Sequence, residues 1–455
     1  MQKKLTARDK WMYGVGDLSL SMTTTIIAAY FAIFLTDVVG LSAAVAAAAI
    51  FIGRTSDYIN DPIIGYISDK TRSRWGRRRP FILFGALPFA LVFTMMWWHP
   101  PLQSQLALAI YYAFAYMLFD IGATFIYMPY FALTPELTQD YDERTSLTTT
   151  RMFFSILGSL IVFTLPILLV KSFRPENAGR VLLMGGIFGL VSAIPLFLVF
   201  FGTKERMEFQ QQEQPSILVS VKAALKNRPF VFGLVIYLFT TVSMDILQTI
   251  LLFYIKYVVN HEAQSDLIMG TIFVVAICAL PLWEFVSRKM NKRYAYIAGI
   301  AFWAAVQLVL GSLSPSTSWT VVMILCVLAG IGVSAAHVLP WSILPDAIEW
   351  GEWKTGERHE GMFYSLISLV AKVASSIAIP LSLLVLSASG YNSSHAVQPA
   401  SAITGIRLVT GPIPAFLLCS GILFAILYPL GRENYTQIAR ELEARRKAAK
   451  PQEIQ

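Results

Sequence analysis

The residues best suited to hold a small ion lie in one short stretch, Arg54-Thr-Ser-Asp57-Tyr-Ile-Asn60-Asp61-Pro62. Asp57, Asn60 and Asp61 are three and four residues apart, so on a helix their side chains share one face. Two carboxylates and an amide oxygen make a set of hard oxygen ligands for a small cation, or an acceptor for a proton. The alternative is that Arg54 neutralises Asp57 in a structural ion pair. The surrounding sequence is apolar, and carboxylates inside a membrane are costly and usually functional, so we interpret the stretch as an ion site.

A second polar group falls on one helix face further along the chain. Asp120, Thr124 and Tyr127 follow one another at intervals of four and three residues. The Thr124 hydroxyl is a candidate oxygen ligand, although a helical threonine also commonly bonds back to a carbonyl of its own helix. Lys372 lies in another apolar run, where a buried ammonium needs a counter-charge. The two aspartates described above are the best candidates for that role.

Two further side chains carry weaker signals. Trp341 lies near the end of an apolar run, where a tryptophan is more often an interfacial anchor than a stacking platform. His337 is more often a core residue than a proton relay in such a setting. The sequence has no Gly-x-x-x-x-Gly-Lys-Ser/Thr pattern, so pumping driven by ATP is unsupported. Any energy for transport would have to come from a gradient, unless the protein carries out no energy-driven transport.

These residues must be positioned by helices that cross a membrane. Of 455 residues, 56% are hydrophobic and 14% are charged, whereas roughly a quarter are charged in an ordinary soluble domain. A membrane barrel would show short segments of alternating polarity, but this chain has runs near the roughly 20 apolar residues that span a bilayer as a helix. We therefore predict an all-α membrane protein with twelve transmembrane helices. The runs begin near Trp11, Ala43, Pro80, Gln105, Thr149, Val181, Phe230, Asp266, Ala295, Ser318, Gly361 and Ile406.

The basic residues indicate the orientation of these spans. One set of alternate loops, which includes both termini, holds 28 lysines and arginines, and the other set holds four. The positive-inside rule then places both termini in the cytoplasm. The net charge of +8 therefore reflects the membrane topology of the chain. It does not indicate binding to nucleic acid, because such binding would need a basic face on a soluble module. The three cysteines lie within apolar runs, and their odd number argues against a disulfide framework.

The longest polar stretch between spans divides the chain near its middle. It runs from Gly202 to Arg228. We predict an N-terminal six-helix bundle at 1–202, a central cytoplasmic loop at 203–228, a C-terminal six-helix bundle at 229–430 and a cytoplasmic tail at 431–455. The first span ends with residues 30–40 and the seventh with residues 251–260, and their short echo at corresponding positions supports an internal repeat.

Several of these motifs together resemble a known family. The chain is similar to the glycoside-pentoside-hexuronide:cation symporter family of the major facilitator superfamily, whose melibiose-transporting members are the best known. The resemblance covers nearly the whole chain and includes Lys372, eight residues after Tyr364. The motifs that carry it are Tyr13-Gly-Val-Gly-Asp17, Thr36-Asp-Val-Val-Gly40, Asp57-x-x-Asn60-Asp61-Pro62, Ser73-Arg-Trp-Gly76, Pro129-Tyr-x-Ala-Leu133 and Asp346-x-x-Glu349-Trp-Gly-Glu352.

The resemblance implies two six-helix halves around a central cavity that opens alternately to either side. It places the cation on Asp57, Asn60, Asp61 and Thr124, with Na⁺ on the two aspartates if the protein is sodium-coupled. It also implies that Asp69, Arg77 and Arg78, in the loop signature after the second span, pin helix ends together in gating. Around the sugar it implies Arg54, Arg151 and Lys372.

The chain departs from the family at two positions. The carboxylates that hold a galactoside in melibiose-transporting members fall here at Ser21 and Tyr127, so galactoside specificity does not carry over. Asp17 and Asp120 remain nearby, and the sequence leaves open which of them faces the cavity. The expected substrate contacts are Asp17, Ser21, Arg54, Asp120, Tyr127, Arg151, Trp341 and Lys372.

From these features we expect a symporter that imports a glycoside, pentoside or hexuronide with Na⁺ or H⁺. Its expected partners are a small sugar, a monovalent cation and the bilayer. We expect no cofactor, no nucleic acid and no enzymatic activity, and we expect a monomer in a bacterial inner membrane. One alternative is a transporter of lysophospholipids, because some relatives keep the cation residues and lack the sugar carboxylates. A second is a sensor that does not transport, against which the intramembrane charges Asp57, Asp61 and Lys372 argue.

Overall fold

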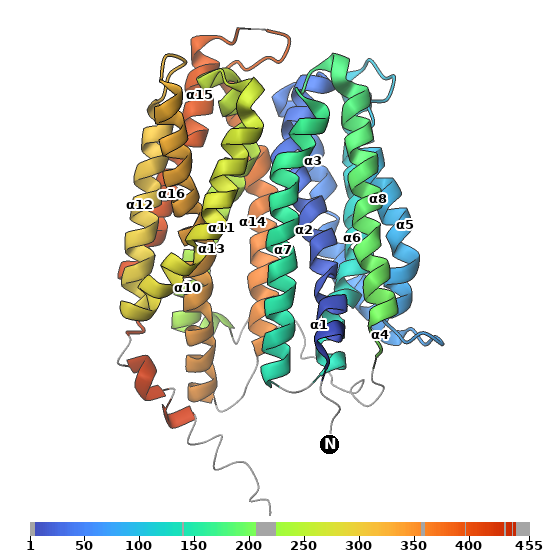
Figure 1. Cartoon of the computed structure of the whole chain (residues 1–455), viewed down its shortest axis with the longest axis vertical. Coiled ribbons are helices and arrows are strands. Elements are labelled where there is room, and N and C mark those ends of the chain that lie inside the picture. The colour runs from blue at the N-terminus through green and yellow to red at the C-terminus, as the bar shows by residue number, and fades with distance from the viewer. Residues whose placement is uncertain are drawn as a thin grey trace, which may run out of the picture. The chain divides into compact units, whose positions relative to one another are not determined.

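In the computed structural model, most of the described residues lie in helices (Figure 1). The structure describes residues 5–138, 141–205, 224–355, 360–395, 397–431, 434–438 and 440–442. Most of the predicted central loop and of the tail therefore lies outside the described residues. Among the described residues, ten helices are long and apolar enough to cross a membrane. The predicted all-α membrane fold is confirmed.

The two predicted spans nearest the N-terminus are each built from shorter pieces. The first comprises α1 (Ala7–Gly14), α2 (Gly16–Ile26) and two π-helical turns, η1 (Ile27–Phe31) and η2 (Phe34–Val38). The second comprises α3 (Ala43–Arg54) and α4 (Asp57–Lys70). At the break between them, the Thr55 hydroxyl donates to Ile52 O at 2.6 Å and Ser56 Oγ donates to Gly53 O at 3.1 Å. Such side-chain bonds compete with helix continuation, and they place Asp57 in the first turn of a new helix.

The chain divides into two compact units. The first holds Met1–Glu213 together with Gln248–Gly270 and Ile379–Ile406. Its long helices are α5 (Arg79–Met96), α6 (Gln105–Leu137), α7 (Tyr141–Val170) and α8 (Ala178–Gly202), with a short 3-10 turn, η3 (Pro175–Asn177), before α8. Within this unit α5 packs against α6 and α8, and α2 packs against α7 (Figure 1).

The second unit holds Gln214–Leu247, Thr271–Ala378 and Arg407–Gln455. Its helices α12 (Lys292–Ser312), α13 (Trp319–Thr355) and α16 (Pro412–Ile426) lie wholly within it, and α12 packs against both others. Four more helices have residues in both units: α10 (Arg228–Phe253), α11 (Ser265–Lys289), α14 (Glu360–Ala388) and α15 (Ala400–Thr410). The remaining elements are η5 (Tyr254–Val259) and η6 (Glu262–Gln264).

Aromatic side chains fill the core of the first unit. The Trp97 ring lies 5.7 Å from that of Phe31 and 5.3 Å from that of Phe34, measured between ring centroids. Gly185 of α8 lets the helices approach here, since a Cβ on it would collide with Trp97. Small residues at helix contacts are the usual means of close packing in membranes.

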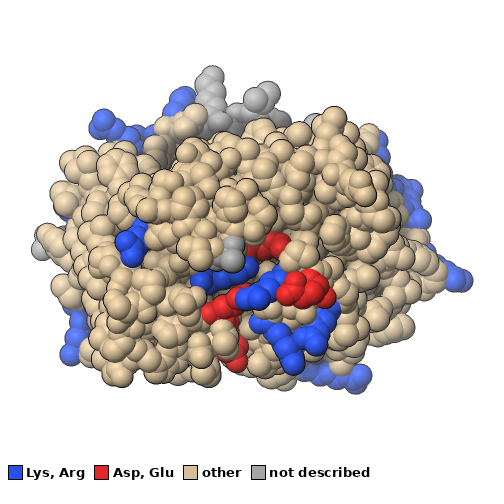
Figure 2. Space-filling model, turned by 90° about the horizontal axis from the view of Figure 1, so that it is seen from above, with Lys and Arg blue, Asp and Glu red and all other residues tan. Residues whose placement is uncertain are grey.

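Large apolar side chains also cover much of the outside, as a lipid-facing surface requires. Phe201, Phe416 and Leu106 are at least 70% exposed. In the end view of Figure 2 most of the surface is uncharged; the acidic side chains gather in one patch together with basic ones, and further basic side chains lie around the rim. The protein is thus a multi-pass membrane protein.

Candidate functional site

The predicted ion site lies on α4 where it packs against α6, inside the first unit. Thr124 Oγ1 donates a hydrogen bond to Asp61 Oδ1 at 3.1 Å. Thr124 is buried, while Asp57, Asn60 and Asp61 are half-buried. The Asn60 Nδ2 atom is buried and has no hydrogen-bond partner among the described residues. The structure therefore brings a hydroxyl from α6 to the carboxylate face of α4, which is the oxygen-rich arrangement that a small cation or a shared proton needs.

Asp17 is held in a charge-balanced cluster of the same unit. Arg151 of α7 forms an ion pair with Asp17, and its Nη2 atom donates to Asp17 Oδ1 at 3.3 Å. The Tyr130 hydroxyl donates to Asp17 Oδ2 at 3.0 Å. The Arg151 guanidinium also lies 4.7 Å from the centre of the Phe131 ring. Asp17 is only 6% exposed, so Arg151 supplies the positive charge that its burial requires.

Ser21 and Tyr127 occupy packed positions. Ser21 Oγ donates to Leu18 O at 3.3 Å, and a side chain added at Gly158 of α7 would collide with Ser21 Oγ. The Tyr127 hydroxyl lies 3.0 Å from Ser19 Oγ, and its ring meets Phe89 edge-on at 5.8 Å. Both side chains are at most 6% exposed. Their contribution to substrate contacts stays a prediction.

The remaining predicted residues of the first unit lie close in sequence to the ion site. Arg54 ends α3, three residues before Asp57, and Asp120 lies on α6 one turn before Thr124. Both are half-buried. Asp120 therefore shares α6 with Thr124, and Arg54 ends the helix that comes directly before α4.

The basic loop before α5 is organised by a carboxylate that the sequence analysis missed. Glu205, just after α8, accepts backbone N–H groups of Arg77 at 2.7 Å, Arg78 at 2.8 Å and Arg79 at 2.9 Å. Arg78 also donates to Ser68 Oγ of α4. An anion at a helix N-terminus satisfies its free N–H groups, so Glu205 ties the start of α5 to the end of α8. Asp69 lies on α4, and its side chain lies outside the described part of the structure.

A second carboxylate cluster that sequence reasoning missed surrounds Asp37. This side chain, 5% exposed, accepts Lys256 Nζ at 2.6 Å, the Tyr257 hydroxyl at 2.5 Å and the Tyr391 hydroxyl. Thr36 Oγ1 donates to it at 2.8 Å. The network joins the end of the first span to η5 and to the segment after α14. Its signal in the sequence was the paired occurrence of Asp37 and Lys256 in the echoed span ends.

In the second unit, the predicted Trp341 contacts α10, and the predicted Lys372 lies on α14 one turn before a residue that contacts α10. Trp341 is 41% exposed, and its ring meets Tyr237 of α10 edge-on at 5.1 Å. Lys372 is half-buried on α14, three residues before Ser375, whose hydroxyl donates to Asp245 of α10. Asp245 was missed, although a carboxylate in an apolar run is the same signal that identified Asp57. The predicted counter-charge for Lys372 lies in the other unit and stays a prediction.

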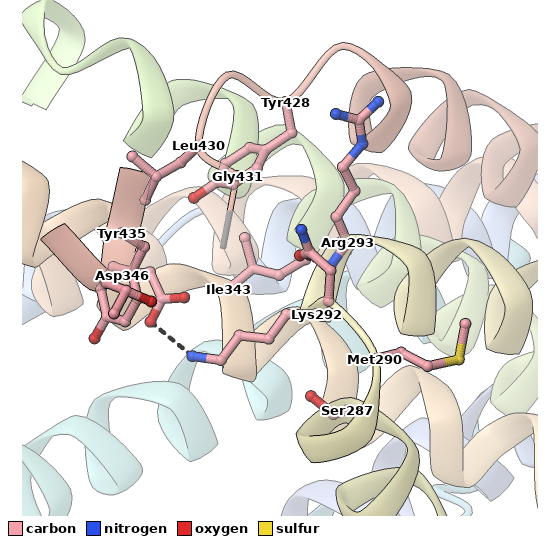
Figure 3. A pocket seen from close by; sticks show the side chains of 12 residues that line it. Ser287, Met290, Lys292, Arg293, Ile343, Asp346, Tyr428, Leu430, Gly431 and Tyr435 are labelled. Atoms are coloured by element: carbon pink, nitrogen blue, oxygen red, sulfur yellow. Dashed lines mark hydrogen bonds and ion pairs between the residues drawn. The ribbon is translucent and has the colours of Figure 1, made fainter. Parts of the chain in front are cut away.

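Asp346, the first residue of the Asp346-x-x-Glu349 motif, lines a cavity of about 230 Å³ in the second unit (Figure 3). Lys292 Nζ, at the start of α12, lies 2.7 Å from Asp346 Oδ1. The Tyr435 hydroxyl, beyond α16, donates to Glu349 Oε2 at 2.7 Å. The motif thus connects the end of α13 to the start of α12 and to the segment after α16.

Comparison with known proteins identifies the class to which this architecture belongs. The family model described as "MFS/sugar transport protein" matches residues 12–432. The chain belongs to this family of membrane transporters, and the family expected from the sequence is confirmed. Among its relatives is the isoprimeverose transporter of Lactiplantibacillus pentosus, 28% identical over 90% of this chain and 86% of that protein.

Another relative transports a different class of molecule. The sodium-dependent lysophosphatidylcholine symporter 1-A of Danio rerio is 27% identical over 95% of this chain and 87% of that protein. Among solved structures, a D-xylose-proton symporter superposes with a TM-score of 0.65 at 17% identity, covering 93% of this chain and 97% of that one. This likeness confirms the major facilitator fold.

Proposed function

We propose that the protein is a cation-coupled symporter that imports a glycoside, pentoside or hexuronide by alternating access, with Na⁺ or H⁺ as the coupling ion. The observation that carries the proposal is the contact between Thr124 and Asp61, through which a hydroxyl from the candidate membrane span Gln105–Thr134 joins the oxygen groups of α4. The family match and the isoprimeverose-transporting relative support a sugar as cargo.

The coupling follows from electrostatics. Asp57 and Asp61 lie one turn apart on α4, so two negative charges at these positions repel each other. A bound Na⁺ or a shared proton relieves that repulsion, with Thr124 and Asn60 supplying neutral oxygens to the cation. If the closed carrier requires both cation and sugar, each ligand must increase the affinity of the other by the same factor.

The sugar contacts in the proposal come from the ion-paired Asp17 and Arg151, from Trp341 and from Lys372. A galactoside lacks its two carboxylate partners here, because Ser21 and Tyr127 occupy those positions. A hydrogen bond to a charged group contributes roughly 1.5 to 3 kcal/mol, so melibiose should be transported weakly or not at all.

The second candidate cargo is a lysophospholipid, favoured by the similarity to the lysophosphatidylcholine symporter. Such a substrate enters through a lipid-facing opening between helices, whereas a sugar uses an aqueous path lined by hydroxyls and rings. Measuring whether the purified protein binds a sugar or lysophosphatidylcholine distinguishes the two cargos. A sensor without transport activity is disfavoured by the set of intramembrane charges.

The proposed location is the inner membrane of a bacterium, with both termini in the cytoplasm. The excess of lysine and arginine in one set of loops supports this orientation. The proposed transport unit is a monomer, because one chain carries both the ion residues and the sugar residues.

The experiment that tests the proposal is uptake by Asp61→Asn in vesicles with imposed Na⁺ or pH gradients. Asparagine keeps the shape of the side chain and removes its charge, so accumulation against a gradient should be lost while exchange of substrate continues. Glu176→Gln, an exposed carboxylate of the same unit, is the matched control and should accumulate substrate normally. Normal accumulation by Asp61→Asn under either gradient would show that this aspartate does not couple transport.

A further inference from the structure

Asp245 is a carboxylate in the middle of an apolar membrane helix. It lies on α10, within a candidate span that runs from Arg228 to Val259. Ionisable residues at such positions are costly, and they face the protein interior or a water-filled cavity. Asp245 is half-buried, so part of its surface is accessible.

Two hydroxyl side chains of α10 are fully buried, whereas Asp245 is half-buried. Thr240 donates to Ile236 O at 2.9 Å, and Ser243 donates to Phe239 O at 2.8 Å. Both side chains are at most 1% exposed, so their polar groups are satisfied by the packed interior. The face of α10 that carries Asp245 is therefore distinct from the face that packs.

The second unit holds several groups suited to a sugar besides Asp245, on the same helix or on helices that contact it. Ser375 of α14 donates a hydrogen bond to it, and Lys372 lies one turn before Ser375. Tyr237 lies eight residues, about two turns, before Asp245 on α10. The ring of Tyr237 meets the partly exposed Trp341 ring of α13. Three helices thus present a carboxylate, a hydroxyl, an ammonium and two aromatic rings.

We propose that Asp245 is a substrate-binding residue that anchors a polyhydroxylated ring, accepting hydrogen bonds from neighbouring hydroxyl groups while Trp341 and Tyr237 pack against the ring. The inference rests on the proposed sugar transport and deepens it. A carboxylate has two oxygens that accept from adjacent hydroxyls, and charge-assisted bonds of this kind are about twice as strong as neutral ones. In this chain Asp245 supplies the charge that Ser21 and Tyr127 lack.

The same rings and carboxylate also resemble a site for a quaternary ammonium, such as the choline of a lysophospholipid. The Lys372 ammonium argues against that ligand, because it places a positive charge one turn from the residue that contacts Asp245. A sugar hydroxyl, in contrast, accepts a hydrogen bond from an ammonium and donates one to a carboxylate. The cluster therefore favours a sugar over a choline headgroup.

The test measures binding of isoprimeverose, D-xylose, glucuronic acid and choline to the purified full-length protein. We expect the parent to bind at least one of the three sugars, and Asp245→Asn to weaken that binding at least tenfold. Na⁺ or H⁺ should stabilise the folded Asp245→Asn variant as much as it stabilises the folded parent. Asp245→Glu, which retains the charge, should bind the sugar better than Asp245→Asn. Glu284→Gln, an exposed carboxylate of α11, is the matched control and should bind as the parent does.

The outcomes separate this inference from the proposed function. Unchanged sugar binding by a folded Asp245→Asn overturns the role of Asp245 and leaves sugar transport intact. Should Asp245→Asn fail to fold, Asp245→Ser takes its place, and unchanged sugar binding by that folded variant overturns the role of Asp245 as well. Binding of choline but of no sugar by the parent contradicts both the sugar assignment and the proposed function.

Discussion

Replacing Asp37 with asparagine should destabilise the protein by about 3 kcal/mol, at the lower end of the range for breaking a buried ion pair. The variant removes the negative charge that balances Lys256, whose side chain is only 12% exposed. Removal of one partner from a buried pair typically costs about 3 to 5 kcal/mol, because the other charge stays buried. Glu262 lies 3.9 Å from Lys256 Nζ and offsets part of that cost, which selects the lower value.

A double-mutant cycle isolates the interaction. Asp37→Asn, Lys256→Met and the double variant would be unfolded reversibly in detergent, and their free energies of unfolding compared with the parent. Because Lys256→Met removes the charge that Asp37→Asn leaves uncompensated, the double variant should be more stable than the sum of the single changes predicts. Additive effects, or a loss below about 1 kcal/mol for Asp37→Asn, would refute the assignment of a buried pair.

Three further predictions follow from other described residues. Thr124→Val keeps the size of the side chain but removes its hydroxyl, so the affinity for the cation should fall, while sugar binding in the absence of Na⁺ should persist. The measurement is a calorimetric titration with the cation, and a cation affinity equal to that of the parent would contradict this prediction. Burial, and then the negative charge of Asp37, raise the pKa of Tyr391 well above its usual value. The unfolded chain therefore loses this proton near pH 10 while the folded protein keeps it, so stability should fall above pH 10, and less steeply in Tyr391→Phe; equal slopes in melting curves would exclude this linkage. In a cysteine-free background, an impermeant thiol reagent applied to intact cells should label Gln103→Cys and not Arg72→Cys, and labelling of the latter would reverse the orientation.

Much of the fold could be predicted because a long apolar run can form few structures other than a membrane-spanning helix. The predicted starts near Phe230 and Gln105 agree with helices that begin at Arg228 and Gln105. The break after Arg54 was not predicted, because it depends on hydroxyls that bond to the preceding turn. The sequence has no pattern that reveals such local competition.

The ion site was within reach of sequence reasoning because its residues are close together on one helix. Thr124 could be added through the resemblance, and the structure places it beside Asp61. Asp37 and Glu205 could not be assigned in the same way, because their partners lie far along the chain. Lys256 is separated from Asp37 by 219 positions, and the echo of the two span ends does not by itself show that these residues are in contact.

The central claim is that a cation and a sugar bind to this protein cooperatively. The most direct measurement is calorimetric titration of the purified protein with its best-bound sugar at several Na⁺ concentrations and pH values, followed by the converse titration of the cation at fixed sugar concentrations. The account predicts that Na⁺ or H⁺ raises sugar affinity, and that the sugar raises affinity for that cation by the same factor. Sugar affinity that is independent of both Na⁺ and pH would contradict it.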